Sequence, residues 1–210
     1  MSAAVLHRDE LILVVGGTQL WSCGASAKLI ATSDVQMNCL ASLDSTLFLG
    51  AAGARVALLK GGSIEFSEGF DRLTGRSAWN TPWGGPPDVR SLAGSNAGEI
   101  FANIHVGWIA KSSDLGANWI ECIDGLEKDV HQVVVHPDRS ETVLAATATG
   151  FYLSEDSGGL FERKPDPMPY HYQRAVACIP GSDTFLVSTS RGPHGNANAR
   201  LYRTIDAAES

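Results

Sequence analysis

Two stretches of the chain share one eight-residue pattern. Residues 112–119 read SSDLGANW and residues 154–161 read SEDSGGLF, so a serine, an aspartate, a glycine and an aromatic residue recur at the same positions, 42 residues apart. A weaker third copy begins at Thr204, with Asp206 at the aspartate position and Ala208 at the glycine position. Recurrence at such a spacing indicates a repeat architecture, in which each repeat is one supersecondary unit.

The residue types of the octads are those of a tight turn. An aspartate and a small hydroxyl residue accept hydrogen bonds from nearby backbone N–H groups, glycine adopts backbone angles that other residues resist, and an aromatic ring anchors the turn by packing beneath it. Turn chemistry alone accounts for these side chains, so we expect a structural role for Ser112, Asp114, Gly116, Trp119, Ser154, Asp156, Gly158 and Phe161.

Short apolar runs separated by turn signals surround each octad, which is the pattern of an all-β repeat protein. Three such runs and a corner make one unit, with a short fourth strand after the aromatic residue. The predicted units are 35–70, 89–125 and 130–165, with partial units at 9–34 and 172–210, and Gly61-Gly62 replaces the octad in the first complete unit. Four-stranded units of 40 to 50 residues are typical of β-propeller blades.

The octads resemble the Asp-box of the Asp-box (BNR) β-propeller superfamily, which includes sialidases and Vps10-type receptors. The resemblance covers about residues 89–210 and implies an all-β propeller of four-stranded antiparallel blades. We expect one domain over 1–210, with four to five blades of an incomplete six- or seven-bladed ring. Because Ser210 comes one residue before the aromatic expected in the third octad, we also expect the array to continue further.

The composition narrows the possible partners. The 210 residues carry 16 Lys and Arg against 23 Asp and Glu, a formal net charge of -7, with no basic run for a nucleic acid. No apolar stretch is long enough to span a bilayer, and no signal peptide is recognisable. The four cysteines lack metal-ligand or CxxC spacing, which favours reduced thiols and a cytoplasmic location.

A ligand site is expected on the rim opposite the octads, where the loops between strands two and three and between successive blades meet. The longest of these, 69–88, has no strand signal, and loops of that length are often functional. The histidines, arginines, aromatics and aspartate that map to this rim are Arg76, Trp79, Trp83, Arg90, His105, Asp129, His131, Tyr170, His171, Tyr172, Arg174 and His194. Trp79 and Trp83 form either a stacking platform for a sugar or a plug.

Two functions remain open. The first is a binding module for a glycan, a peptide or a protein, since propellers carry unrelated functions on one scaffold. The second is a sialidase-like exo-glycosidase, for which the resemblance implies an arginine triad, a tyrosine nucleophile paired with a glutamate, and an aspartate as acid and base. Arg76, Arg90, Arg174 and Tyr170 or Tyr172 match by location only. No metal and no cofactor is expected, because no metal-ligand or cofactor motif is present.

Overall fold

The computed structural model describes residues 3–165 and 168–204, and they form five antiparallel sheets. The first contains β1 (Ala3–His7), β2 (Glu10–Val15), β3 (Gln19–Cys23) and β4 (Ala27–Thr32). The second contains β5 (Met37–Leu43), β6 (Thr46–Ala51), β7 (Arg55–Lys60) and β8 (Ser63–Phe66). The third contains β9 (Val89–Gly94), β10 (Ile100–Ile104), β11 (Ile109–Ser112) and β12 (Ile120–Cys122). The fourth contains β13 (Val130–His136), β14 (Arg139–Thr147), β15 (Phe151–Ser154) and β16 (Glu162–Arg163), and the fifth β17 (Tyr172–Cys178), β18 (Phe185–Ser190) and β19 (Arg200–Thr204).

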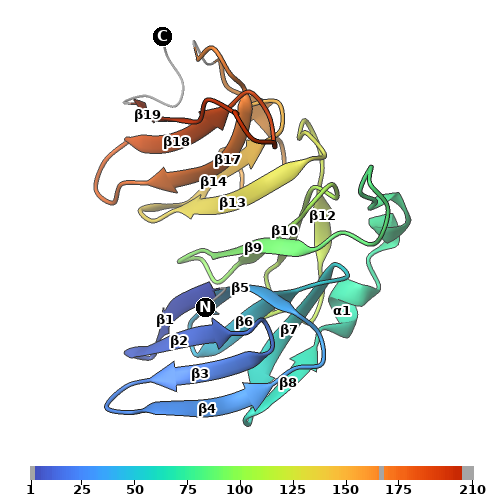
Figure 1. Ribbon diagram of the computed structural model, residues 1–210, viewed down its shortest axis with the longest axis vertical. Coiled ribbons are helices and arrows are strands. Elements are labelled where there is room, and N and C mark those ends of the chain that lie inside the picture. The colour runs from blue at the N-terminus through green and yellow to red at the C-terminus, as the bar shows by residue number, and fades with distance from the viewer. Residues whose placement is uncertain (1–2, 166–167, 205–210) are drawn as a thin grey trace.

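The sheets are propeller blades arranged in an open arc. The first strands of successive blades pack side by side in the order β1, β5, β9, β13, β17, and the blades follow one another from the bottom to the top of Figure 1. Within the described residues, no comparable packing joins β17 back to β1. The prediction of an all-β propeller with four-stranded antiparallel blades is confirmed. The third octad extends past Thr204 and lies outside the described residues.

The first blade differs from its prediction. Residues 9–34 were expected to supply only the outer strands of a blade, but they belong to a complete four-stranded sheet that begins with β1 at Ala3. The β1–β2 hairpin turns at Arg8 and Asp9, which both have positive φ (49° and 65°). Such two-residue turns normally carry asparagine or glycine, so Arg8-Asp9 gave no turn signal and β1 was missed.

The connection after β8 also contains more structure than expected. It holds a helical turn, α1 (Glu68–Asp71), which Ser67 caps by accepting a hydrogen bond from the Phe70 N–H, and a 3₁₀ turn (Thr74–Ala78). Phe70 is fully buried, and its ring lies 5.1 Å from that of Trp119, centroid to centroid. The long connection is therefore anchored to the core through an octad aromatic.

The two octads form equivalent corners between the third and fourth strands of neighbouring blades. In the first, the Ser112 hydroxyl accepts a hydrogen bond from the Gly116 N–H at 2.9 Å, and Asp114 Oδ1 accepts one from the Asn118 N–H at 2.8 Å. In the second, Ser154 and Asp156 accept the same bonds from Gly158 and Leu160, each at 2.9 Å. Gly116 and Gly158 have φ of 85° and 84°, a region that favours glycine.

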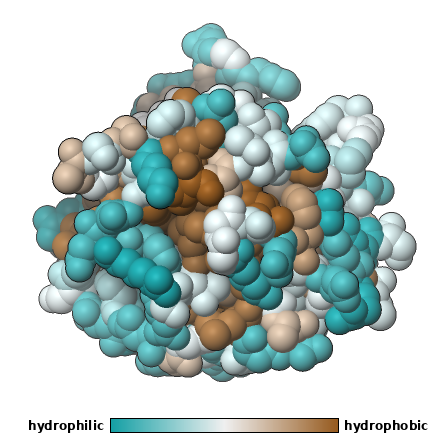
Figure 2. Space-filling view, turned by 90° about the horizontal axis from the view of Figure 1, so that it is seen from below, coloured by the Kyte–Doolittle hydropathy of each residue, from teal (hydrophilic) through white to brown (hydrophobic). Residues whose placement is uncertain are grey.

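The core lies between the blades, where apolar faces of adjacent sheets meet. In the first blade, alternate residues point to opposite faces, so Ile12 is 3% exposed while its neighbour Leu11 is 43% exposed. Hydrophobic surface is also visible from outside. In the view from below, it is concentrated near the middle of the molecule and is surrounded by hydrophilic side chains (Figure 2).

Candidate functional site

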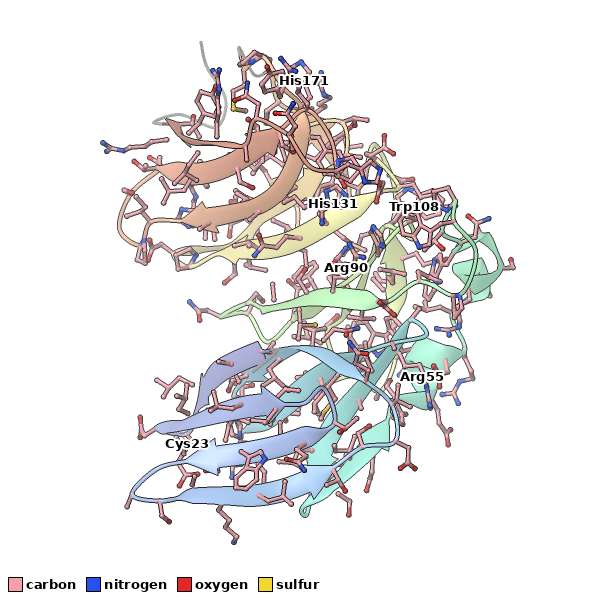
Figure 3. The ribbon with its side chains drawn as sticks, in the orientation of Figure 1. Cys23, Arg55, Arg90, Trp108, His131 and His171 are labelled. Carbon is pink, nitrogen blue, oxygen red and sulfur yellow. The ribbon has the colours of Figure 1, made fainter. Side chains whose placement is uncertain are left out.

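A cavity of about 380 Å³ lies at the end of the blades opposite the octads. Antiparallel topology places the starts of the first strands and the loops between second and third strands at this end. The residues that line the cavity are Trp83, Arg90, His105, Asp129, Tyr172, Arg174, Pro193 and His194. An adjoining cavity shares both arginines and is lined by Asn38, Asp88, Arg90, His131 and Arg174. Figure 3 shows Arg90 and His131 on the neighbouring strands β9 and β13.

A backbone contact recurs at this end and defines equivalent positions in the blades. In three consecutive blades, the first residue after the second strand donates its N–H to the carbonyl of the residue before the first strand. These bonds run from Ala52 to Gln36, from His105 to Asp88 and from Ala148 to Asp129, over 2.9, 2.9 and 3.0 Å. His105 therefore occupies a position at which the blades on either side carry alanine.

His105 reaches from its own blade to the start of the next one. Its Nε2 lies 3.4 Å from Asp129 Oδ1, and His131 Nε2 lies 3.4 Å from the same oxygen. The side chains of His105 and His131 are 5% and 2% exposed, and that of Asp129 is 27% exposed. Two imidazoles and one carboxylate, contributed by two adjacent blades, thus converge on one point.

Burial and charge set the protonation of this cluster. Burial, reinforced by the positive charge of Arg90, lowers the pKa of His105 to about 4, so this ring is neutral at pH 7. Burial by itself raises the pKa of Asp129, but the neighbouring His131, His105 and Arg90 outweigh burial and hold this pKa below its usual value. Asp129 is therefore a carboxylate at neutral pH.

The ring of His131 is held from its other side. Its Nδ1 is hydrogen-bonded to the backbone carbonyl oxygen of Gln173, in β17, and its ring centroid lies 4.7 Å from that of Tyr172. Yet His131 Nε2 and Asp129 Oδ1 are both buried without a hydrogen-bond partner. Buried polar atoms are nearly always paired, so this is an unusual arrangement.

Two guanidinium groups lie on either side of this cluster. Arg90 is the second residue of β9 and Arg174 the third of β17, and both line both cavities. Within residues 3–165 and 168–204, no salt bridge joins either guanidinium to a carboxylate. Both are therefore available to bind an anionic group, for which arginine is well suited.

Aromatic rings supply the apolar part of the cavity wall. Trp83 is 66% exposed, and its ring centroid lies 5.1 Å from that of His105. Tyr172 lies on the opposite blade, with the Arg174 guanidinium 5.3 Å from its ring centroid. An exposed tryptophan beside a polar cavity provides a flat face on which a ligand can stack.

The rim residues predicted from sequence fall into two groups. Eight of the twelve line the two cavities, namely Trp83, Arg90, His105, Asp129, His131, Tyr172, Arg174 and His194. Asn38, Asp88 and Pro193 line them too and are not among the twelve. The other four of the twelve, Arg76, Trp79, Tyr170 and His171, line neither cavity.

Local packing explains the position of three of these four residues. Trp79 is 7% exposed and packs 5.7 Å from the Phe70 ring, so it cannot form a platform with Trp83. Arg76 donates to the Ala54 carbonyl at 2.9 Å and lies over Trp79. The Tyr170 hydroxyl accepts hydrogen bonds from Arg191 and Asn198, in the connection between β18 and β19.

Solved structures similar to this chain are β-propellers. An ancestral GH74 enzyme matches with a TM-score of 0.74 and 15% identity, over 95% of this chain and 28% of that one. The WD40 propeller domain of Doa1 gives 0.62 and 14% identity, over 90% and 62%. YCF48 bound to D1 peptide gives 0.63 and 14% identity, over 96% and 63%. At these identities the likeness establishes the fold alone.

Sequence comparisons add no closer relative. No protein-family model matches the chain, and no curated protein matches it. This chain spans only 28% and 36% of the lengths of the ancestral GH74 enzyme and of the Niastella koreensis GH74 enzyme. In the described part of the chain, no helix is both long enough and apolar enough to cross a bilayer.

Proposed function

We propose that this protein is a non-catalytic binding propeller of the Asp-box superfamily and that it recognises a ligand bearing a carboxylate group. The site is the cavity opposite the octads. Arg90 and Arg174 bind the carboxylate, and Trp83 and Tyr172 pack against the apolar part of the ligand. Acidic sugars and the C-terminus of a peptide both present this chemistry.

The observation that carries the proposal is the placement of the two arginines. They come from β9 and β17, two blades apart, yet they line one cavity of about 380 Å³ without a salt bridge to a carboxylate among the described residues. Guanidinium groups bind carboxylates through paired, charge-assisted hydrogen bonds, which are about twice as strong as neutral ones. A cavity of this size and composition is typical of small-ligand sites.

The alternative, a sialidase-like exo-glycosidase, has less support. Such an enzyme pairs its tyrosine nucleophile with a glutamate, and no glutamate is among the described residues that line either cavity. Arg76, a candidate for the arginine triad, lies over Trp79 instead. The structural neighbours include glycoside hydrolases as well as a WD40 domain and a peptide-binding propeller, so their fold does not decide between the two functions.

Calorimetric titration with two matched ligand pairs tests the proposal. The pairs are glucuronate against glucose, and a tripeptide with a free C-terminus against its C-terminal amide. We expect saturable binding of the charged member of at least one pair and at least tenfold weaker binding of the neutral member. The pair that shows the difference identifies the source of the carboxylate.

Variants locate the binding. Arg90→Gln combined with Arg174→Gln should abolish the preference for the charged member, while Arg72→Gln, which removes a surface arginine paired with Glu68, should leave it unchanged. The proposal fails if neither pair is distinguished, or if the double variant binds as tightly as the wild type. Turnover of an aryl sialoside that is lost on Tyr172→Phe would instead favour the glycosidase.

A further inference from the structure

We propose that His105, Asp129 and His131 form a binding site for a divalent transition-metal ion, with zinc as the ion that fits best. The ligand atoms are the Nε2 atoms of the two histidines and Oδ1 of Asp129. The inference does not depend on the carboxylate ligand proposed above, because it rests on the geometry of this cluster.

The distances within the cluster match a tetrahedral site. Zinc binds histidine nitrogen at about 2.0–2.1 Å, so two ligand atoms of a tetrahedral site lie about 3.3 Å apart. Here both nitrogens lie 3.4 Å from Asp129 Oδ1, and all three atoms lie within 4.8 Å of one another. To complete the tetrahedral geometry, the two histidine nitrogens must also lie about 3.3 Å apart.

The hydrogen bond of His131 orients its free nitrogen for a metal. A backbone carbonyl oxygen only accepts, so the Gln173 oxygen requires the proton on His131 Nδ1. In the neutral ring, the lone pair of Nε2 then faces the carboxylate oxygen of Asp129. Metal-binding histidines commonly donate their other ring N–H to a backbone carbonyl in this way.

Without a cation, this arrangement leaves two buried acceptors side by side. His131 Nε2 and Asp129 Oδ1 both lack a hydrogen-bond partner, and His131 is only 6% exposed. Leaving a buried polar group without a partner is unfavourable. A metal ion would pair both atoms at once. A proton on His131 Nε2 would pair them too, and the zinc titration described below distinguishes the two.

Comparison of the blades shows that this cluster of three residues occurs only at the junction between the third and fourth blades, among the equivalent positions of the second to fifth blades. At the previous junction, the positions equivalent to His105, Asp129 and His131 hold Ala52, Asp88 and Arg90. At the next junction they hold Ala148, His171 and Gln173. Turn geometry is shared by the blades, so it does not explain why three ligand residues meet at one of them.

The ligand types and the surroundings indicate which ion binds and how strongly. Imidazole suits zinc and its neighbours, while magnesium and calcium prefer sites made of oxygen alone. Three protein ligands leave the fourth position open, and both His105 and Asp129 line the cavity that Trp83 and Tyr172 also line. Arg90 and Arg174 repel a cation, so we expect a dissociation constant on the order of micromolar.

The test is calorimetric titration of untagged, chelator-treated protein with zinc chloride and, separately, with magnesium chloride. We expect one equivalent of zinc to bind and magnesium not to compete. Asp129→Asn and His105→Gln should each weaken zinc binding at least tenfold. Glu65→Gln is the control, because it removes a surface carboxylate that is paired with Lys60 and lines neither cavity, and it should bind zinc within about threefold of the wild type.

Folding of each variant is checked by thermal unfolding, and saturating zinc should raise the melting temperature of the wild type and of Glu65→Gln only. Because His131 is buried, His131→Gln is informative only if it folds, and the other two variants decide the question otherwise. The proposal is overturned if the wild type shows no saturable zinc binding, if Asp129→Asn and His105→Gln bind as tightly as the wild type, or if Glu65→Gln loses as much affinity as they do.

Discussion

The Gly116 backbone N–H donates a hydrogen bond to the hydroxyl of the buried Ser112 over 2.9 Å, and this contact closes the corner between β11 and β12. Removing the hydroxyl leaves a buried N–H without a partner, so Ser112→Ala should lower the free energy of unfolding by about 1–3 kcal/mol. Ser154→Ala should have a similar effect at the second corner. Urea denaturation measures both. The exposed neighbour Ser113→Ala is the control, and an equal loss in this variant would contradict the account.

The octad aspartates should contribute stability that depends on pH. Hydrogen bonds from the Asn118 backbone and side chain lower the pKa of Asp114, and the Leu160 N–H and the Ser154 hydroxyl lower that of Asp156. A carboxyl whose pKa is lower in the folded state contributes its full stability above its unfolded pKa of about 3.9 and loses it as pH falls through the folded pKa. The stability difference between wild type and Asp114→Asn should therefore be constant above about pH 5 and shrink below pH 4. A difference that grows on acidification would be inconsistent with these bonds.

The strand pattern was predictable where the turns use common residues. The hairpin at Gly61-Gly62 and the octad corners were found because glycine and aspartate mark them, whereas β1 was missed because its hairpin turns at Arg8 and Asp9. The burial of Trp79 was not predictable either. It depends on Phe70, which α1 places against Trp79 and Trp119, and no local pattern distinguishes Trp79 from the exposed Trp83.

The register of the first blade predicts opposite effects for two adjacent residues. Ile12 is 3% exposed and packs between the first two blades, while Leu11 on the other face is 43% exposed. Ile12→Ala should therefore cost about 2–5 kcal/mol of unfolding free energy, and Leu11→Ala less than about 1 kcal/mol. Chemical denaturation of the two variants measures the difference. A larger loss for Leu11→Ala than for Ile12→Ala would mean that the strand is shifted by one residue.

The buried cysteines should resist alkylation in the folded protein. Burial raises the pKa of Cys39 and of Cys122 to about 12, so at pH 8 only about one thiol in ten thousand is the reactive thiolate. Iodoacetamide labelling followed by mass spectrometry should modify the partly exposed Cys23 first. All four cysteines should react once the protein is denatured. Native labelling of Cys39 as fast as that of Cys23 would show that the second blade opens readily.

The candidate site was only partly visible in the sequence. The order of the strands within each blade was enough to predict that His105, Asp129 and His131 lie at the same end of the propeller. No metal-ligand spacing connects the three residues, because they belong to two blades. The signal that would have linked them is the comparison of equivalent positions, where His105 replaces the alanines Ala52 and Ala148. The orientation of His131 depends on the Gln173 carbonyl of a third blade and has no sequence signature.

The most direct test of carboxylate binding by Arg90 and Arg174 is a nuclear magnetic resonance titration that follows the Nε–H signals of the arginine side chains. The ligand added is glucuronate or the tripeptide with a free C-terminus, whichever binds in the calorimetric titration. If Arg90 and Arg174 bind the carboxylate, two signals should shift together and saturate, while the signal of Arg72 does not move. One of the two should be absent in Arg90→Gln and the other in Arg174→Gln. Equal, unsaturable shifts of all arginine signals, or shifts confined to residues outside the cavity, would contradict carboxylate binding by these two arginines.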